Sequence, residues 1–242
     1  MTDAALAAAI ADEAGGLLRR IRDERSETGK ALGDRGDREA NKLILARLAA
    51  ERPEDFVLSE ESLDDRRRCS ARRVWIVDPL DGTQEYAHGL NDWAVHIGLA
   101  VDGRPAAGAV AVPALGRVWC TDHAHAATPP PARPRVVVSR TRCPEIARRV
   151  GEALNAELIA MGSAGAKTMA VVDGRADIYL HAGGQYEWDN CAPAAVALAA
   201  GLHASRIGGA PLRYNCVDPL LPDLLICRPE LAGQVIGIVT RS

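Results

Sequence analysis

The chain has 242 residues, 48% hydrophobic and 25% charged, a balance typical of a globular protein that buries a large core. Its net charge of -3 argues against a general nucleic-acid-binding surface, which usually carries an excess of Lys and Arg. No stretch approaches about 18 consecutive apolar residues, and the N-terminus lacks a basic segment before an apolar one, so the sequence predicts a cytoplasmic protein without a membrane span.

The six cysteines are scattered along the chain without a C-x-x-C pair or a dense framework. Neither a zinc site nor a disulfide scaffold is indicated by this spacing. We expect reduced, mostly buried thiols.

Two amphipathic helices are expected near the N-terminus, over residues 3–24 and 39–52, the second ended by Pro53. Residues 57–120 then read mainly as strands, because apolar runs such as WAVHIGLAV and AAGAVAV are separated by turn signals such as DGRP. The expected packing is two helices against an antiparallel sheet.

The composition shifts at HAHAATPPPARPR, residues 123–135, where Pro and Ala replace patterned sequence. We place a subdomain boundary there, with an N-terminal subdomain at 1–128 and a C-terminal subdomain at 129–242. In the C-terminal subdomain strands alternate with helices, which indicates an α/β layer, and a final hairpin and strand are expected at its end.

The stretch VWIVDPLDGTQEY, residues 74–86, is the most informative part of the sequence. Four apolar residues predict a short buried strand, Pro79 stops that strand from pairing onward, and Gly82 permits a sharp turn. Asp78 and Asp81 are therefore expected close together. Like charges at short range need a counter-charge, and all-oxygen ligands favour Mg²⁺ or Mn²⁺ over Zn²⁺.

The residues after this acidic pair suit a phosphate group. Gly82 and Thr83 supply free backbone N–H groups and a hydroxyl at the start of a helical turn. Divalent cations commonly accompany phosphate substrates, so the two features point to the same chemistry.

Three further segments place acids beside core-like sequence, and each also has a purely structural interpretation. Asp37 follows Asp34 and could cap the second helix, Asp189 follows Glu187 and could cap the helix after it, and the Glu60–Glu61 pair could face solvent. These alternatives remain open for each segment taken alone.

The segments S-E-E at 59–61, D-P-L-D-G-T at 78–83 and W-D-x-x-A at 188–192 closely resemble the signatures of the inositol monophosphatase superfamily of Mg²⁺-dependent, lithium-sensitive phosphatases. The resemblance covers nearly the whole chain in the order of the family. It implies an α+β or α/β fold, a layered α-β-α-β-α sandwich of the inositol monophosphatase/fructose-1,6-bisphosphatase type.

Within the superfamily, LSEES, GSAGAKTMAVVDGRADIYLH and WDNCAPAAVALAAG look most like the CysQ branch of 3'-phosphoadenosine 5'-phosphate phosphatases, and KALGDRGDREAN and WAVHIGLAV look like its actinobacterial members. This resemblance implies an enzyme of sulfur metabolism that removes the 3'-phosphate of 3'-phosphoadenosine 5'-phosphate, and of its sulfated form, to give AMP and phosphate. The alternatives are the same chemistry on inositol 1-phosphate or fructose 1,6-bisphosphate, and a non-catalytic nucleotide sensor.

The resemblance also implies roles for individual residues. Glu60, Asp78 and the backbone carbonyl of Leu80 would hold a first Mg²⁺, and Asp78, Asp81 and Asp189 a second, with a weaker third ion near Glu60. Glu60 would belong to the catalytic set with Asp37 and Thr83, which would orient and deprotonate the attacking water. Family members usually have Thr or Ala before this aspartate, whereas Gly36 precedes it here, so Asp34 is the competing candidate.

Substrate contacts are expected from residues of three segments: Gly82, Thr83, Ser139, Arg140, Ser163 and Lys167. For Ser163 and Lys167 the alternative is a capping serine and a solvated lysine. The resemblance further implies a homodimer that acts on a small phosphorylated substrate, and inhibition by Li⁺ at the metal site that contains Asp189. No nucleic-acid or membrane partner is expected.

Overall fold

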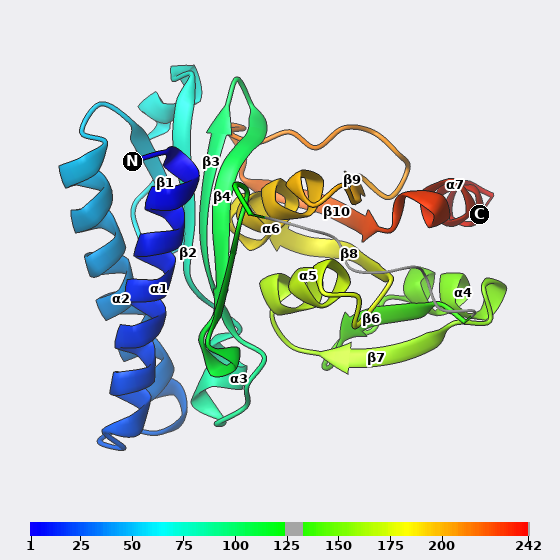
Figure 1. The fold of residues 1–242 in the computed structure, drawn as a ribbon, viewed down its shortest axis with the longest axis horizontal. Coiled ribbons are helices and arrows are strands. Elements are labelled where there is room, and N and C mark those ends of the chain that lie inside the picture. Colours follow the sequence, from blue (N-terminus) through cyan, green and yellow to red (C-terminus); the bar gives the residue numbers. More distant parts are fainter. Residues whose placement is uncertain (124–132, 242) are drawn as a thin grey trace.

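The computed structural model describes residues 1–123 and 133–241 and arranges them in two five-stranded sheets with three layers of helices (Figure 1). The predicted subdomain boundary between residues 128 and 129 lies outside the described residues. The segments before and after the gap each form one of the two sheets.

The first sheet has the order β1-β2-β3-β4-β5. Its strands are β1 (Phe56–Ser59), β2 (Arg73–Asp81), β3 (Ala94–Val101), β4 (Arg104–Val112) and β5 (Arg117–Cys120). The predicted antiparallel pairing is confirmed for β2 to β5, but β1 pairs with β2 in parallel. Parallel pairing is possible because residues 60–72, which include the short 3-10 helix η1 (Arg66–Ser70), return the chain to the starting edge of the sheet.

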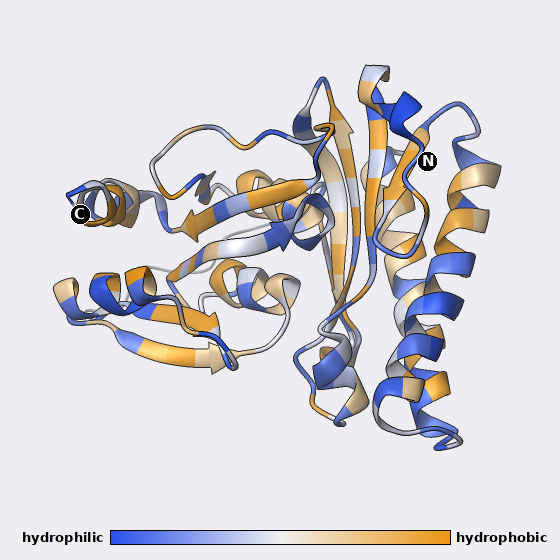
Figure 2. Cartoon of the chain, turned by 180° about the vertical axis from the view of Figure 1, so that it is seen from behind, coloured by the Kyte–Doolittle hydropathy of each residue, from blue (hydrophilic) through white to orange (hydrophobic). Residues whose placement is uncertain are grey.

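Helices α1 (Asp3–Asp23) and α2 (Gly29–Glu51) cover the outer face of this sheet (Figure 1). The first begins after Thr2, whose side chain accepts a hydrogen bond from the Ala5 N–H. Apolar side chains of both helices share one core with the sheet, while hydrophilic residues turn outward (Figure 2). That core includes Leu6, Ile10, Leu18, Ile44, Leu48, Trp75 and Val77.

Helix α2 begins at Gly29, ten residues before the predicted start. The predicted start was wrong because the segment GKALGDRGD is polar and contains glycines, which lower helix propensity. In the fold Gly33 faces the helix that follows β2: a Cβ at this position would lie 2.7 Å from the Thr83 Cγ2 atom. The missing side chain permits this close approach, which only tertiary packing requires.

The second sheet has the order β7-β6-β8-β10-β9. Its strands are β6 (Arg135–Ser139), β7 (Glu157–Met161), β8 (Ile178–Tyr186), β9 (His203–Ser205) and β10 (Leu220–Cys227). Strand β6 pairs in parallel with β7 and β8, and β10 pairs antiparallel with β8 and β9. Its outer face is covered by α4 (Glu145–Ala153) and α7 (Pro229–Thr240) (Figure 1).

The C-terminal helix α7 corrects the predicted final strand. The run QVIGIVT is rich in β-branched residues, which favour strands. However, Pro229 occupies the first turn of the helix, and Leu231, Ala232 and Val235 form one buried face against the second sheet. Burial of this face outweighs the intrinsic preference.

Helices α5 (Ala164–Val172) and α6 (Glu187–Ala199) lie between the two sheets (Figure 1). Their buried side chains form one core with residues of both sheets, such as Ile76 from β2 and Ile226 from β10. The predicted α-β-α-β-α sandwich is therefore confirmed. Because these helices touch both sheets, their first residues can meet the end of β2.

Among the described helices we find none that is both long enough and apolar enough to cross a membrane.

Candidate active site

Strand β2 ends in a bulge that carries two carboxylates. Asp78 pairs with His96 of β3 and Asp81 pairs with Ala94, so the register shifts at Pro79 and Leu80. The strand therefore resumes pairing after the proline, contrary to the prediction that pairing would stop there. The bulge bends the chain so that both aspartates stay buried.

The predicted turn follows immediately. Gly82 has a φ of 87°, in the left-handed region, and helix α3 (Thr83–Ala87) begins after it. A Cβ at Gly82 would also meet the Asp92 carbonyl oxygen and the Ser163 Cβ at 3.3 Å. Glycine is thus required both by the backbone conformation and by the packing.

The third carboxylate comes from the other half of the chain. Asp189 is the third residue of α6, and each of Asp78, Asp81 and Asp189 contributes one oxygen to a group whose members all lie within 4.8 Å of one another. The Asp189 Oδ2 atom also accepts a hydrogen bond of 2.6 Å from the Tyr186 N–H, as a residue that caps a helix would. The two interpretations of Asp189 are therefore compatible.

Glu60 follows β1 and lies at the rim of this acidic cluster. Its backbone N–H donates to the Val77 carbonyl oxygen at 3.2 Å, which extends the parallel pairing toward the turn. Burial by the surrounding protein, followed by the charges of Asp189 and Asp81, raises the pKa of Glu60 to about 7. Glu60 is exposed and lies within reach of the charges of Asp189 and Asp81, beside the group of close oxygens formed by Asp78, Asp81 and Asp189.

Asp37 lies inside α2 and contacts Thr83, rather than capping the helix. The Thr83 hydroxyl is 3.3 Å from Asp37 Oδ2 and 3.1 Å from the Leu80 carbonyl oxygen, both of which accept. Burial, followed by the charges of Glu61 and Glu60, raises the pKa of Asp37 to about 7. Its other oxygen, Oδ1, is buried and has no hydrogen-bond partner among the described residues.

Asp34 lies one turn before Asp37 on the same helix. Its carboxylate forms an exposed ion pair with Lys30, with an N–O distance of 2.6 Å. Among the described residues it accepts hydrogen bonds from Lys30, whereas the Thr83 hydroxyl donates to Asp37.

Asp81 is stabilised by donors from both halves of the chain. Its Oδ2 atom accepts hydrogen bonds from the Ser163 hydroxyl and, at 2.8 Å, from the Gly165 N–H. Burial alone would raise the pKa of Asp81, but His96 and the nearby Lys167 lower it below its usual range. Burial raises the pKa of Asp78 well above its usual range, with Glu60 adding to the effect. This charge distribution suits a bound cation beside Asp78.

Next to the carboxylates lies a cavity of about 400 Å³, lined by residues of α3, β6, α5 and β8. Its lining includes five of the six residues that the sequence predicts as substrate contacts: Gly82, Thr83, Ser139, Ser163 and Lys167. Arg140 is not part of the described lining. Its guanidinium pairs instead with Glu85 at 3.0 Å and with Asp92.

Lys167 lines this cavity and is buried, rather than solvated. Its ammonium group donates to the Gly162 carbonyl oxygen at 3.2 Å and lies 5.3 Å from the centre of the Tyr179 ring. Burial lowers the pKa of Lys167. Ser163 caps α5 through the Ala166 N–H and also contacts Asp81, so its capping role does not remove it from the site.

His96 is a residue of the site that the sequence did not reveal. It is fully buried in β3, with Nε2 3.2 Å from Asp81 Oδ2 and Nδ1 3.1 Å from the Trp188 carbonyl oxygen. The available signal was a single histidine in the otherwise apolar run WAVHIGLAV, directly across from Asp78. Without the register of β2 and β3, that histidine cannot be placed.

Three comparisons relate this site and fold to known proteins. The model of the inositol monophosphatase family matches residues 2–239. The chain is 54% identical over 254 residues to a protein of Mycobacterium leprae (strain TN) named 3'-phosphoadenosine 5'-phosphate phosphatase, with 99% of this chain and 94% of the relative covered. It is 32% identical over 192 residues to the 3'(2'),5'-bisphosphate nucleotidase CysQ of Escherichia coli (strain K12), with 73% of this chain and 76% of that relative covered.

A similar fold is found in the crystal structure of CysQ from Bacteroides thetaiotaomicron, described as a bacterial member of the inositol monophosphatase family. The TM-score is 0.80 at 28% sequence identity, and the match covers 93% of this chain and 97% of that one. Together with the family match over nearly all residues and the convergence of two signature segments, D-P-L-D-G-T and W-D-x-x-A, on one acidic cluster, this similarity establishes the relationship. The chain belongs to the inositol monophosphatase family.

Proposed function

We propose that this protein is a Mg²⁺-dependent phosphomonoesterase that hydrolyses the 3'-phosphate of 3'-phosphoadenosine 5'-phosphate to give AMP and phosphate. The observation that carries the proposal is the convergence of Asp78, Asp81 and Asp189 beside a cavity that contains further polar groups. The name of the M. leprae relative, at 54% identity over nearly the whole chain, supports the choice of substrate. The sulfated form of the same nucleotide is a second expected substrate.

The residues of the site fit a hard divalent cation. The candidate ligands are oxygen atoms, several of the carboxyl groups have raised pKa values, and the buried Asp37 Oδ1 atom lacks a partner among the described residues. Glu60, Asp78 and the Leu80 carbonyl would hold a first Mg²⁺, and Asp78, Asp81 and Asp189 a second. A third ion near Glu60, and Mn²⁺ as a substitute, belong to the same proposal.

When bound, such ions favour deprotonation of a water molecule and stabilise negative charge on the phosphoryl and leaving oxygens. The residues of the chain supply orientation and proton transfer. Asp37 Oδ1 is the acceptor for a proton of the attacking water, because its partner oxygen is already engaged by Thr83. The ion pair of Asp34 with Lys30 favours Asp37 over Asp34 in this role.

The phosphate would lie over the turn after β2. Gly82 and Thr83 line the cavity there, and their backbone N–H groups would donate to phosphoryl oxygens. Lys167 contributes a buried ammonium group to the lining of the same cavity, and Ser139 and Ser163 offer hydroxyl groups. Arg140 remains a candidate for the second phosphate only if a ligand draws it away from Glu85 and Asp92.

The proposal includes a homodimer, by family resemblance, and a cytoplasmic location, as the N-terminal sequence led us to expect. The described cysteines are unpaired, which is consistent with a reducing compartment. Light scattering of the purified protein measures the mass in solution, and a single 25.7 kDa species would contradict the dimer.

The experiment that tests the proposed function is phosphate release by the purified protein at saturating Mg²⁺. We would compare kcat/KM for 3'-phosphoadenosine 5'-phosphate, inositol 1-phosphate and fructose 1,6-bisphosphate, with EDTA as the control. A preference of about a hundredfold for the nucleotide, roughly 2.7 kcal/mol of discrimination, is expected. Similar rates on the sugar phosphates would indicate a broad phosphatase, and no release from any substrate would indicate the nucleotide sensor.

A further inference from the structure

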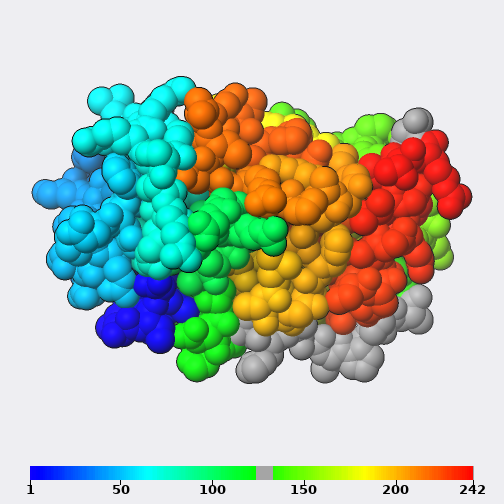
Figure 3. All heavy atoms as spheres, turned by 90° about the horizontal axis from the view of Figure 1, so that it is seen from above, coloured from blue at the N-terminus to red at the C-terminus, as the bar shows by residue number. Residues whose placement is uncertain are grey.

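A buried arginine connects the loop after Glu60 to the second half of the chain. Arg68 of η1 is fully buried, and its guanidinium forms a two-pronged ion pair with Asp64, at 2.7 and 2.8 Å. Its NH1 group donates to Asn215 Oδ1 at 2.9 Å and to the Cys216 carbonyl oxygen at 3.0 Å. The two segments also meet at the surface, where residues of the 60s lie against residues near 215 (Figure 3).

The amino group of the Asn215 side chain also binds the segment that contains Arg68. Its amide nitrogen donates to the Arg68 carbonyl oxygen at 2.9 Å and to the Ala71 carbonyl oxygen at 3.2 Å. Its φ is 61°, in the left-handed region where asparagine is better tolerated than most residues. Asn215 thus holds the 3-10 helix through both its carbonyl and its amino group.

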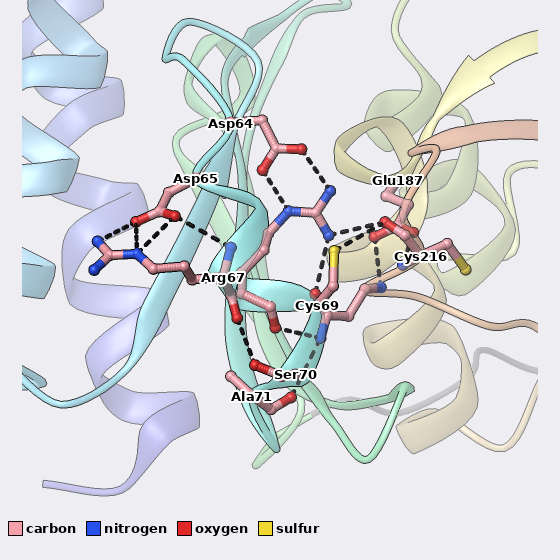
Figure 4. Close-up of polar contacts among 10 residues, drawn as sticks. Asp64, Asp65, Arg67, Cys69, Ser70, Ala71, Glu187 and Cys216 are labelled. Carbon is pink, nitrogen blue, oxygen red and sulfur yellow. Dashed lines mark hydrogen bonds and ion pairs between the residues drawn. The ribbon is translucent and has the colours of Figure 1, made fainter.

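The same turn is bound to the first residue of α6. Glu187 is fully buried, and its two carboxylate oxygens accept from consecutive backbone N–H groups, of Asn215 at 2.7 Å and of Cys216 at 2.8 Å (Figure 4). Two hydrogen bonds to one carboxylate fix its orientation, and with it the orientation of the first turn of α6. Asp189 is two residues farther along that turn.

The arrangement matters because the acidic residues of the site come from separate parts of the chain. Glu60 and Asp78 belong to the first sheet and its loops, whereas Asp189 belongs to α6. Oxygens of Asp78, Asp81 and Asp189 lie within 4.8 Å of one another, and like charges at this distance repel. Other contacts must therefore hold the two groups of residues close to each other.

We propose that Arg68, Asn215 and Glu187, which we call the clamp, are positioning residues that hold the Asp189 end of α6 against the Glu60 side of the site and thereby set the affinity for the divalent cation. None of the three is placed in contact with the cation or the substrate. The inference rests on the proposed function in one respect, namely that Asp189 binds a divalent cation.

The first test is the variant Glu187→Gln. Glutamine keeps the volume, but its amino group would face one of the two backbone N–H groups as a second donor, so the turn at 215–216 loses one of its two anchors. We expect the Mg²⁺ dissociation constant, measured by calorimetry on metal-free protein, to rise by about 10- to 100-fold. At saturating Mg²⁺, kcat should stay within about threefold of wild type, because the clamp does not touch the reacting groups.

The second test, Asn215→Gly, separates the two halves of the clamp. Glycine accepts the left-handed backbone and keeps both N–H donors for Glu187, but it removes the side-chain contacts to Arg68 and Ala71. We expect the Mg²⁺ dissociation constant to rise here as well. The double variant with Glu187→Gln should bind Mg²⁺ within about twofold of the weaker single variant, because residues of one network are not additive.

The matched control is Asp177→Asn. Asp177 is also a fully buried carboxylate that accepts from a backbone N–H, of Arg135 at 2.9 Å, and from the Arg228 side chain at 2.8 Å, but it lies outside the candidate site. We expect this variant to lower the melting temperature without changing the Mg²⁺ dissociation constant.

Wild-type Mg²⁺ affinity in both Glu187→Gln and Asn215→Gly would overturn the clamp while leaving the proposed function intact. So would equal losses of affinity in these variants and in Asp177→Asn, since the effect would then be general destabilisation. If Glu187→Gln does not fold, Asn215→Gly and its control decide the question. If the wild type neither binds Mg²⁺ nor releases phosphate, the proposed function fails and the clamp fails with it.

Discussion

His96 Nε2 lies 3.2 Å from Asp81 Oδ2 in the interior of the protein, and the other ring nitrogen lies 3.1 Å from the Trp188 carbonyl oxygen. The Nδ1 contact has hydrogen-bond geometry, whereas Nε2 has no hydrogen-bond partner among the described residues and approaches Asp81 as an ion pair. One imidazole therefore links the end of β2 to the first turn of α6 by one hydrogen bond and one electrostatic contact. Burial alone would lower the pKa of His96, but the carboxylate of Asp81 outweighs it and raises the pKa above its usual value.

The variant His96→Gln tests this connection. Glutamine carries no positive charge and has a single amino group, so Asp81 loses its ion pair or the Trp188 carbonyl loses its hydrogen bond, while the contacts of Asp81 to Ser163 and Gly165 remain. We expect the Mg²⁺ dissociation constant to rise by about 10- to 100-fold and the melting temperature to fall. Calorimetry and thermal melts of this variant would be compared with His203→Gln, which changes a histidine of β9 outside the candidate site. Equal behaviour of the two variants would contradict the connecting role.

The variant Asp81→Asn should abolish turnover while leaving the fold largely intact. The amide oxygen can still accept from Ser163 and from the Gly165 N–H, but the negative charge is lost. We expect kcat to fall by at least about a thousandfold, since metal stabilisation of the transition state is worth several kcal/mol. Phosphate release and circular dichroism check the two parts of this expectation, and an active, folded variant would exclude Asp81 as a ligand.

Asp37→Asn and Thr83→Val should lower kcat by roughly 10²- to 10⁴-fold, as expected when proton transfer from water is lost. Because Thr83 contacts Asp37 and the Leu80 carbonyl oxygen rather than the acidic cluster directly, Mg²⁺ affinity should change much less than kcat in Thr83→Val. Asp34→Asn is the matched control, since that aspartate pairs with Lys30. A greater loss of activity in Asp34→Asn than in Asp37→Asn would reverse the assignment of the two aspartates.

The metal-free protein should become less stable as the pH rises from about 4 to 7. Burial and neighbouring carboxylates raise the pKa of Asp37 and Glu60 to about 7 and that of Asp189 to about 6. The same groups titrate near pH 4 in the unfolded chain, so the folded protein binds more protons within this window and loses stability as they dissociate.

Thermal melts of chelator-treated protein between pH 5 and pH 8 measure this dependence. Mg²⁺ should raise the melting temperature more at pH 8 than at pH 5, because at the lower pH it competes with bound protons. A metal-free melting temperature that rises from pH 5 to pH 8 would show that the acidic cluster does not dominate the titration.

Local sequence determined much of this protein. The turn after β2 is predictable from Gly82 itself, which adopts the left-handed backbone conformation there. The short apolar runs identify most of the strands. The order of residues 78–83 also placed the carboxylates Asp78 and Asp81 close together, and the resemblance of the signature segments to a known family added Asp189, which the structure brings beside them. These features are predictable because each depends on backbone preferences or on the pattern within a few residues.

Other features were decided only by tertiary structure. The early start of α2 depends on the close approach of Gly33 to Thr83, and the helical state of α7 depends on a buried face that outweighs its β-branched residues. His96 and the clamp could not be placed, because their partners are distant in sequence and are defined by strand register and helix packing. The sequence by itself determined which residues carry the charge, and the packing of two sheets around α5 and α6 decided how those charges are held together.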